Sequence, residues 1–279
     1  MPLNSTGSEA ASVVILPVPY DATQEWRTGA REGPQAIITA SPYLELYDLE
    51  LGYEVHQMGI HTLPEIEPVM GNPAAMLHRV YENTLRWLDR GKKVVMLGGE
   101  HSLTTGAVRA YREKFPQLSV LHLDAHADLR HEYLGTIYSH ACAMRRVMEL
   151  CPVVSAGVRS LSLEESDFIK SKNIKLFYAG EKPLDEADIS GIISALSDDV
   201  YITIDMDVFD PSIMPAVGTP EPGGLGWHEV LRLLREVARQ KRVAGFDLVE
   251  LCPREGPTSC AYLAAKLAYK LIGYSFARR

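Results

Sequence analysis

Short continuous runs of apolar residues alternate along the chain with longer segments in which apolar positions recur every three or four residues. The continuous runs predict strands buried on both faces of a parallel sheet, and they lie at residues 12–17, 54–60, 94–97, 118–123, 152–156, 174–178, 200–204 and 243–249. The helical period predicts helices over 72–91, 227–240 and 257–273. Strands that alternate with helices favour crossover connections and a parallel sheet between two helical layers.

The first of these helices carries clear end signals. Asn72 is expected to cap its start, Pro73 to stand in its first turn, and Gly91 to end it. No linker rich in proline, glycine or serine interrupts the pattern. Residues 1–279 are therefore expected to form a single domain.

Composition excludes some partners and compartments. The 279 residues carry a formal net charge of −8, which argues against nucleic acid or an anionic membrane surface and suits a small cationic ligand. No apolar run approaches the roughly 20 residues of a membrane span, and the first residues lack the features of a signal peptide. The four cysteines form no CxxC pair, so we expect free thiols and a cytoplasmic protein.

Titratable side chains follow four of the predicted strands directly, at the edge where open α/β sheets bind ligands. The residues that stand there are His101, then Asp124, His126 and Asp128, then Asp205 and Asp207, and finally Glu250. A lone acid or histidine after a strand is usually a turn former or a helix cap. Alternate positions of an extended chain face one side, however, and charges crowded there repel one another unless a cation holds them. Four such strand ends together favour a metal site.

The ligand set indicates two metal ions. Four carboxylates and two imidazoles exceed the four ligands of a tetrahedral zinc ion, whereas they suit two divalent ions that share bridging carboxylates. Ligation by oxygen with some imidazole and no thiolate favours Mn²⁺. Two such ions about 3.5–4 Å apart can hold a bridging water and lower its pKa towards neutrality. We therefore expect two Mn²⁺ per chain.

Six segments of the sequence resemble the ureohydrolase family of arginases and agmatinases. They are "TGAREGPQAI" (28–37), "LGGEHSL" (97–103), "LDAHADLR" (123–130), "SHACAMRR" (139–146), "ITIDMDVFDPSIMPAVGTPEPGG" (202–224) and "FDLVELCP" (246–253). The resemblance implies a three-layer α/β/α sandwich around a mostly parallel eight-stranded sheet. It also implies six Mn²⁺ ligands, with Asp124 and Asp205 as bridges: His101, Asp124, His126, Asp128, Asp205 and Asp207.

The same resemblance implies hydrolysis of a guanidinium group to urea and a primary amine by a metal-bridging hydroxide. The catalytic residues that it implies are Glu250, which pairs with the guanidinium nitrogens, His140, which carries protons, and Asp128. His122 and the remaining histidines are interpreted as surface or core fillers. Glu100 stands where many relatives have aspartate and is expected to affect the surroundings of the metals without abolishing their binding.

Several substrates and activities stay open. "TPEPGG" and "SHACAMRR" resemble agmatinases, so we expect agmatine to be cleaved to urea and putrescine in polyamine biosynthesis. N1-aminopropylagmatine is the main alternative, and Arg130 leaves guanidinobutyrate possible. Arginine is disfavoured because Leu129-Arg130-His131 lacks the asparagine of arginases. A zinc deacetylase-like amidohydrolase, a two-metal phosphohydrolase and a non-catalytic metal-binding protein are the rival hypotheses. By analogy with the family, a homotrimer or homohexamer is expected.

Overall fold

The centre of the protein is an eight-stranded sheet in a computed structural model that describes residues 3–179 and 184–276. Neighbouring strands pair in parallel throughout the described residues. From one edge to the other the strands are β4 (Ile60–Thr62), β1 (Val13–Val18), β5 (Lys93–Gly98), β10 (Arg242–Val249), β9 (Asp199–Asp205), β6 (Leu118–Leu123), β7 (Val153–Val158) and β8 (Leu176–Tyr178). The predicted parallel sheet is thus confirmed.

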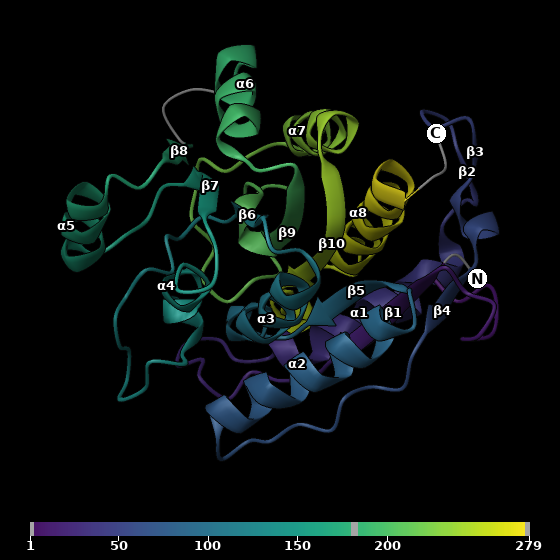
Figure 1. Ribbon diagram of the computed structural model, residues 1–279, viewed down its shortest axis with the longest axis horizontal. Coiled ribbons are helices and arrows are strands. Elements are labelled where there is room, and N and C mark those ends of the chain that lie inside the picture. Colours follow the sequence, from purple (N-terminus) through teal and green to yellow (C-terminus); the bar gives the residue numbers. More distant parts are fainter. Residues whose placement is uncertain (1–2, 180–183, 277–279) are drawn as a thin grey trace.

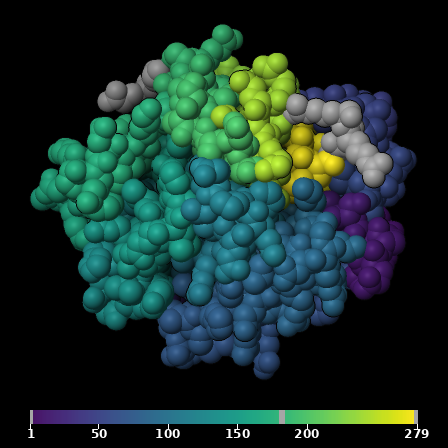
Figure 2. Space-filling model, viewed as in Figure 1, coloured from purple at the N-terminus to yellow at the C-terminus, as the bar shows by residue number. Residues whose placement is uncertain are grey.

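Helices cover both faces of this sheet, which confirms the predicted three layers (Figure 1). One face carries α1 (Gly33–Ala40), α6 (Glu186–Ala195), α7 (Trp227–Gln240) and α8 (Ser259–Phe276). The other face carries α2 (Pro73–Asp89), α3 (Thr104–Lys114), α4 (Ala143–Val147) and α5 (Leu163–Lys172). In Figure 2 the blue surface of α2 lies along the lower edge, and α5 forms the left flank.

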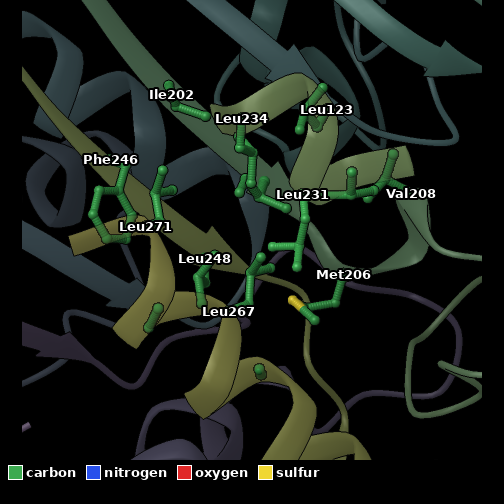
Figure 3. Packing of buried hydrophobic residues seen from close by; sticks show 14 of the residues in the cluster. Leu123, Ile202, Met206, Val208, Leu231, Leu234, Phe246, Leu248, Leu267 and Leu271 are labelled. Carbon is green, nitrogen blue, oxygen red and sulfur yellow. The ribbon is translucent and has the colours of Figure 1, made fainter. Parts of the chain in front are cut away.

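Alternation along the strands produces two hydrophobic cores. In β1, Val13 and Ile15 pack towards α8, whereas Val14 and Leu16 pack towards α2, because successive side chains of a strand point to opposite faces. Figure 3 shows the first core, in which strand and helix side chains interdigitate. Its labelled members are Leu123, Ile202, Met206, Val208, Leu231, Leu234, Phe246, Leu248, Leu267 and Leu271.

Local signals predicted seven strands of the sheet and the helices α2, α7 and α8, whereas the other helices were not predicted. Asn72 caps α2 by accepting a hydrogen bond from Ala75 N–H, and the helix expected over 227–240 has those bounds. The single strand predicted at 54–60 is wrong. The chain forms a 3-10 helix, η3 (Val55–Met58), and Gly59 turns at φ 78° before β4 begins. Apolar periodicity does not reveal that turn, which depends on the positive φ that glycine adopts freely.

A buried ion-pair cluster attaches the short hairpin of β2 (Tyr47–Asp48) and β3 (Tyr53–Glu54) to α8. Lys270 Nζ lies 3.0 Å from Asp48 Oδ2 and 2.8 Å from Glu50 Oε2, and both Asp48 and Lys270 are buried. Burial alone raises the pKa of Asp48, but hydrogen bonding and charge from Lys270 outweigh it and bring the pKa below the usual 3.8.

Replacement of Lys270 by methionine is expected to lower the free energy of unfolding by about 3 kcal/mol, since it leaves a buried carboxylate poorly compensated. Lys266→Met is the control, because Lys266 lies 3.6 Å from Asp48 and is more exposed, and it should cost about 0.5 kcal/mol. A depressed pKa stabilises the fold above the usual value and ceases to do so as the pH falls through the folded-state pKa. The deficit of Lys270→Met, measured by urea unfolding, should therefore shrink below pH 4, and equal deficits for the two variants would contradict this role.

Candidate active site

The predicted site residues meet at the carboxyl ends of the strands. They lie together because β5, β10, β9 and β6 are neighbours in the sheet (Figure 1). The chain passes from β5 to β6 across a gap that β9 and β10 later fill. Such a switch point leaves a crevice at the carboxyl ends of the strands. His101 follows β5, Asp124 follows β6, Asp205 ends β9 and Glu250 follows β10.

Apolar residues between the charged ones fix the direction of each segment. Ala125 and Ala127 are buried. The side chains of Asp124, His126 and Asp128, which alternate with these alanines, lie on the cavity side. After β9, Met206 and Val208 of η6 (Met206–Val208) pack into the core (Figure 3). Asp205, His126, Asp128 and Asp207 line a cavity of about 250 Å³.

Next to this cavity two groups of possible metal ligands share Asp124; one consists of His101, His122, Asp124 and Asp128, and the other of Asp124, His126 and Asp207. In the first, His101 Nδ1 lies 3.0 Å from Asp124 Oδ2 and 3.3 Å from carboxylate oxygens of both Asp128 and Asp205. In the second, His126 Nδ1 lies 2.9 Å from Asp207 Oδ2 and 3.5 Å from Asp124 Oδ1. The two oxygens of Asp124 therefore face different groups, as a bridging carboxylate would.

The hydrogen bonds of His101 leave its Nδ1 free for a metal. Its Nε2 lies 2.9 Å from Thr203 Oγ1, and the Thr203 hydroxyl donates to Asp247. Thr203 must then accept from Nε2–H, so in the neutral imidazole the lone pair is on Nδ1. That atom is buried and has no hydrogen bond among the described residues. An unprotonated imidazole nitrogen facing three carboxylates is the donor arrangement of a divalent-metal site.

The pKa values of two carboxylates in the group also favour a bound cation. Burial, followed by the charges of Asp207 and Asp124, raises the pKa of Asp205 well above the usual aspartate range. Burial and then Asp124 do the same to Asp128. A divalent ion would reverse this effect, because it stabilises the ionised carboxylates that burial disfavours.

The interpretation of His122 as a surface or core filler is wrong. Its Nε2 lies 2.8 Å from Asp124 Oδ2 and its Nδ1 lies 2.9 Å from Ser155 Oγ. Burial lowers its pKa despite the carboxylate beside it, so the ring is neutral and Nε2–H donates to Asp124. The contact with Ser155 arises because β6 pairs with β7 in a register that places His122 opposite Ser155. His122 orients the shared carboxylate.

Two of the site carboxylates sit in the left-handed region of backbone space. Asp128 has φ 54° and Glu250 has φ 65°, conformations that non-glycine residues seldom adopt and that concentrate at functional sites. Glu250 is buried, and its carboxylate accepts from His101 N–H at 2.7 Å and from the Gln24 side chain. The strained backbone aims this acid into the cavity, where a planar guanidinium could meet it.

His140 reaches the cavity from a separate loop, at the start of η5 (His140–Cys142). Thr23, Glu25 and Tyr133 surround it: Thr23 accepts from its main-chain N–H, Glu25 Oε2 lies 3.7 Å from its Nε2, and Tyr133 makes an edge-on ring contact. Burial lowers the pKa of His140. A neutral imidazole close to the cavity can accept and return a proton.

Arg159 stabilises the main chain around the site, and it was not predicted from the sequence. It follows β7 directly, and its guanidinium donates to the main-chain carbonyls of Asp207, Gly157 and Glu221 at 2.7, 3.1 and 2.8 Å. Its place after a strand was the available signal, because the same rule selected the aspartates. Arg159 thus holds the loop that carries Asp207 against the end of β7.

The comparison with protein families decides the identity of the fold and its chemistry. The model of the arginase family matches residues 11–273. The chain belongs to the arginase family. It is therefore a ureohydrolase that acts on the carbon–nitrogen bonds of guanidino compounds. Family members normally hold a binuclear metal site, and the two groups that share Asp124 fit that number.

Named relatives in the arginase family cover nearly the whole chain. The N(1)-aminopropylagmatine ureohydrolase of Synechocystis sp. is 43% identical, over 95% of this chain and 89% of its own length. The agmatinase of Pyrococcus horikoshii is 35% identical, over 99% and 96%. The crystal structure of the agmatine ureohydrolase of Thermoplasma volcanium superposes with a TM-score of 0.88 at 33% identity, over 96% and 91%. No helix in the described part of this family member is long and apolar enough to cross a bilayer.

Proposed function

We propose that this arginase-family enzyme cleaves urea from a guanidino polyamine precursor, with N1-aminopropylagmatine preferred over agmatine. The observation that carries the proposal is the meeting of two ligand groups and Glu250 in one cavity. The proposed ligands are the six residues named from the sequence: His101, Asp124, His126, Asp128, Asp205 and Asp207. Oxygen-rich ligation without thiolate supports Mn²⁺ as the metal.

When bound, the two ions supply Lewis acidity and make hydroxide available near neutral pH. The chain supplies the rest of the chemistry. Glu250 binds the guanidinium and orients its carbon over the ligand groups. His140 moves protons between the cavity and solvent, which the departing amine requires. Asp128 and Asp205 are among the proposed ligands, and their charges would offset those of the two ions.

The cavity lining favours a substrate with a second positive charge. Glu25, Glu165 and Glu250 line it, and Arg130 is the one lysine or arginine among its lining residues. Arg130 stacks on Tyr133, with 5.0 Å from its guanidinium carbon to the ring centroid. The higher identity to the aminopropylagmatine enzyme, 43% against 35%, also supports the longer polyamine.

A urea-release assay with Mn²⁺ tests this choice. We expect kcat/KM to rank N1-aminopropylagmatine about 10-fold above agmatine, a difference of about 1.4 kcal/mol. Guanidinobutyrate and arginine should lie at least about 100-fold below, since a carboxylate would face the acidic lining. A preference for guanidinobutyrate would overturn the proposed substrate and assign the tail to Arg130. One tightly held zinc per chain, with no urea released, would overturn the proposed reaction.

The broader expectations stay predictions. The continuous sheet and the family match over 11–273 support a single domain across residues 1–279. Four buried free cysteines agree with a cytoplasmic location. A homotrimer or homohexamer is checked by light scattering of the purified protein.

A further inference from the structure

One loop between β1 and α1 contacts three separate parts of the site. Thr23 bonds to Glu100 and His140, Gln24 donates to Glu250, and Glu25 lies beside His140. The proposed function gives roles to Glu250 and His140 but none to Thr23. The hydroxyl of Thr23 lies between a buried acid and the proposed proton carrier, so its single proton constrains both.

Three groups compete for the Thr23 hydroxyl. Its Oγ1 lies 2.7 Å from Glu100 Oε1, 3.0 Å from His140 N and 3.2 Å from His140 Nδ1. A hydroxyl donates one hydrogen bond and accepts up to two. The main-chain N–H of His140 can only donate, so it uses one accepting position. The remaining question is whether the proton of Thr23 points to Glu100 or to Nδ1.

Glu100 takes that proton because its oxygen is the nearer of the two acceptors. It is buried, and its oxygens face three donors: Thr23 N–H at 2.7 Å, the Thr23 hydroxyl, and the Ser102 hydroxyl. The Thr23 hydroxyl donates to Glu100 Oε1 at 2.7 Å, whereas His140 Nδ1 lies farther away, at 3.2 Å. Thr23 then presents only lone pairs to His140, and a lone pair on Nδ1 at 3.2 Å would be repelled.

We propose that Thr23 is a positioning residue that holds His140 in the tautomer with Nδ1 protonated, which leaves the Nε2 lone pair towards Glu25 and the cavity. This inference rests on the proposed function of His140 as proton carrier. Nε2 lies 3.7 Å from Glu25 Oε2, too far for a hydrogen bond but close enough to stabilise the imidazolium once Nε2 takes a proton. The longer acid at position 100 thus sets, through Thr23, which nitrogen is the base.

Ser139 is the competing explanation, because its Oγ lies 3.3 Å from the same Nδ1. A serine hydroxyl rotates and either donates to Nδ1 or accepts from it. If Ser139 set the tautomer, removing its hydroxyl would have the larger effect. Ser139→Ala is therefore the matched control for Thr23→Val, since each change deletes one hydroxyl beside the same atom.

The tautomer is measured directly by ¹⁵N NMR of the histidine rings at pH 8, in protein saturated with diamagnetic Mg²⁺ and with His140 assigned from His140→Gln. The wild type and Ser139→Ala should show Nδ1–H, and Thr23→Val should show a mixture of tautomers. Thr23→Ser keeps the hydroxyl and should restore Nδ1–H. An Nε2–H signal in the wild type, or an unchanged tautomer in Thr23→Val, overturns the proposal.

Kinetics with Mn²⁺ add a second readout. Thr23→Val should lose roughly 10-fold to 100-fold in kcat with KM within about a factor of two, and Thr23→Ser should recover most of the loss. A larger loss in Ser139→Ala than in Thr23→Val overturns the assignment. If the wild type releases no urea from any guanidino compound, the proposed function fails, while the NMR result still decides the tautomer.

Discussion

Asp124→Asn is expected to abolish turnover by removing at least one metal ion. Asp124 belongs to both ligand groups, and its two oxygens point to different groups. Asparagine keeps the shape but loses the charge and one acceptor oxygen, so it cannot bridge two ions. Elemental analysis should find at most one Mn²⁺ per chain, and urea release should fall by at least about 1,000-fold.

Asp199→Asn is the matched control for this variant. Asp199 is a buried aspartate at the start of β9, at the opposite edge of the sheet from the cavity, and it pairs with Arg242. The same chemical change there should lower stability but leave metal content and kcat intact. Two Mn²⁺ per chain in Asp124→Asn, with normal turnover, would contradict the shared-ligand assignment.

The ligand candidates could be predicted from the sequence because each of them lies at or directly after the end of a predicted strand. Asp124, His126 and Asp128 stand directly after a buried run, at the strand ends where open α/β sheets bind ligands, but Asp128 has φ 54°, so the alternation of an extended strand does not by itself explain how they meet. Asp205 and Asp207 repeat the pattern. The structure places all five around the cavity or its floor, since the four strands that carry the site are neighbours.

The residues that hydrogen-bond to the ligand candidates could not be predicted, because their contacts depend on the order and register of the strands. Thr203 and Asp247 stand opposite each other only because β9 pairs with β10 in one register. His122 meets Ser155 through the pairing of β6 with β7. A sequence segment does not state its neighbour in the sheet, so a buried threonine in β9 resembles any other β-branched strand residue.

Loop contacts were harder still to predict. Gln24 and Glu250 are far apart along the chain and meet through one side-chain hydrogen bond. No periodicity marks such a contact, which follows from where the loop after β1 crosses the end of β10. Only the fold assigns Thr23, Gln24 and Glu25 to different partners.

Glu250→Gln is expected to keep both metal ions and to lose substrate binding and orientation. Glu250 is not in either ligand group, so Mn²⁺ content should stay at two per chain. Its carboxylate is the proposed partner of the guanidinium, and glutamine offers one neutral acceptor oxygen where two charged oxygens stood. A charge-assisted bidentate pair is worth several kcal/mol when buried, so kcat/KM should fall about 100-fold to 1,000-fold, or about 3–4 kcal/mol.

Two companion variants separate this loss from a general disturbance of the site. Gln24→Ala removes the side chain that holds Glu250 and should cost about 10-fold in kcat/KM, because the charge remains but its position is less fixed. Glu255→Gln makes the same chemical change at a partly exposed residue paired with Arg27 and should leave the kinetics unchanged. If Glu250→Gln also lost a metal ion, the carboxylate would be a ligand and the guanidinium would need another partner. If the kinetics of Glu250→Gln matched those of Glu255→Gln, the proposed role of Glu250 in binding the guanidinium would be contradicted.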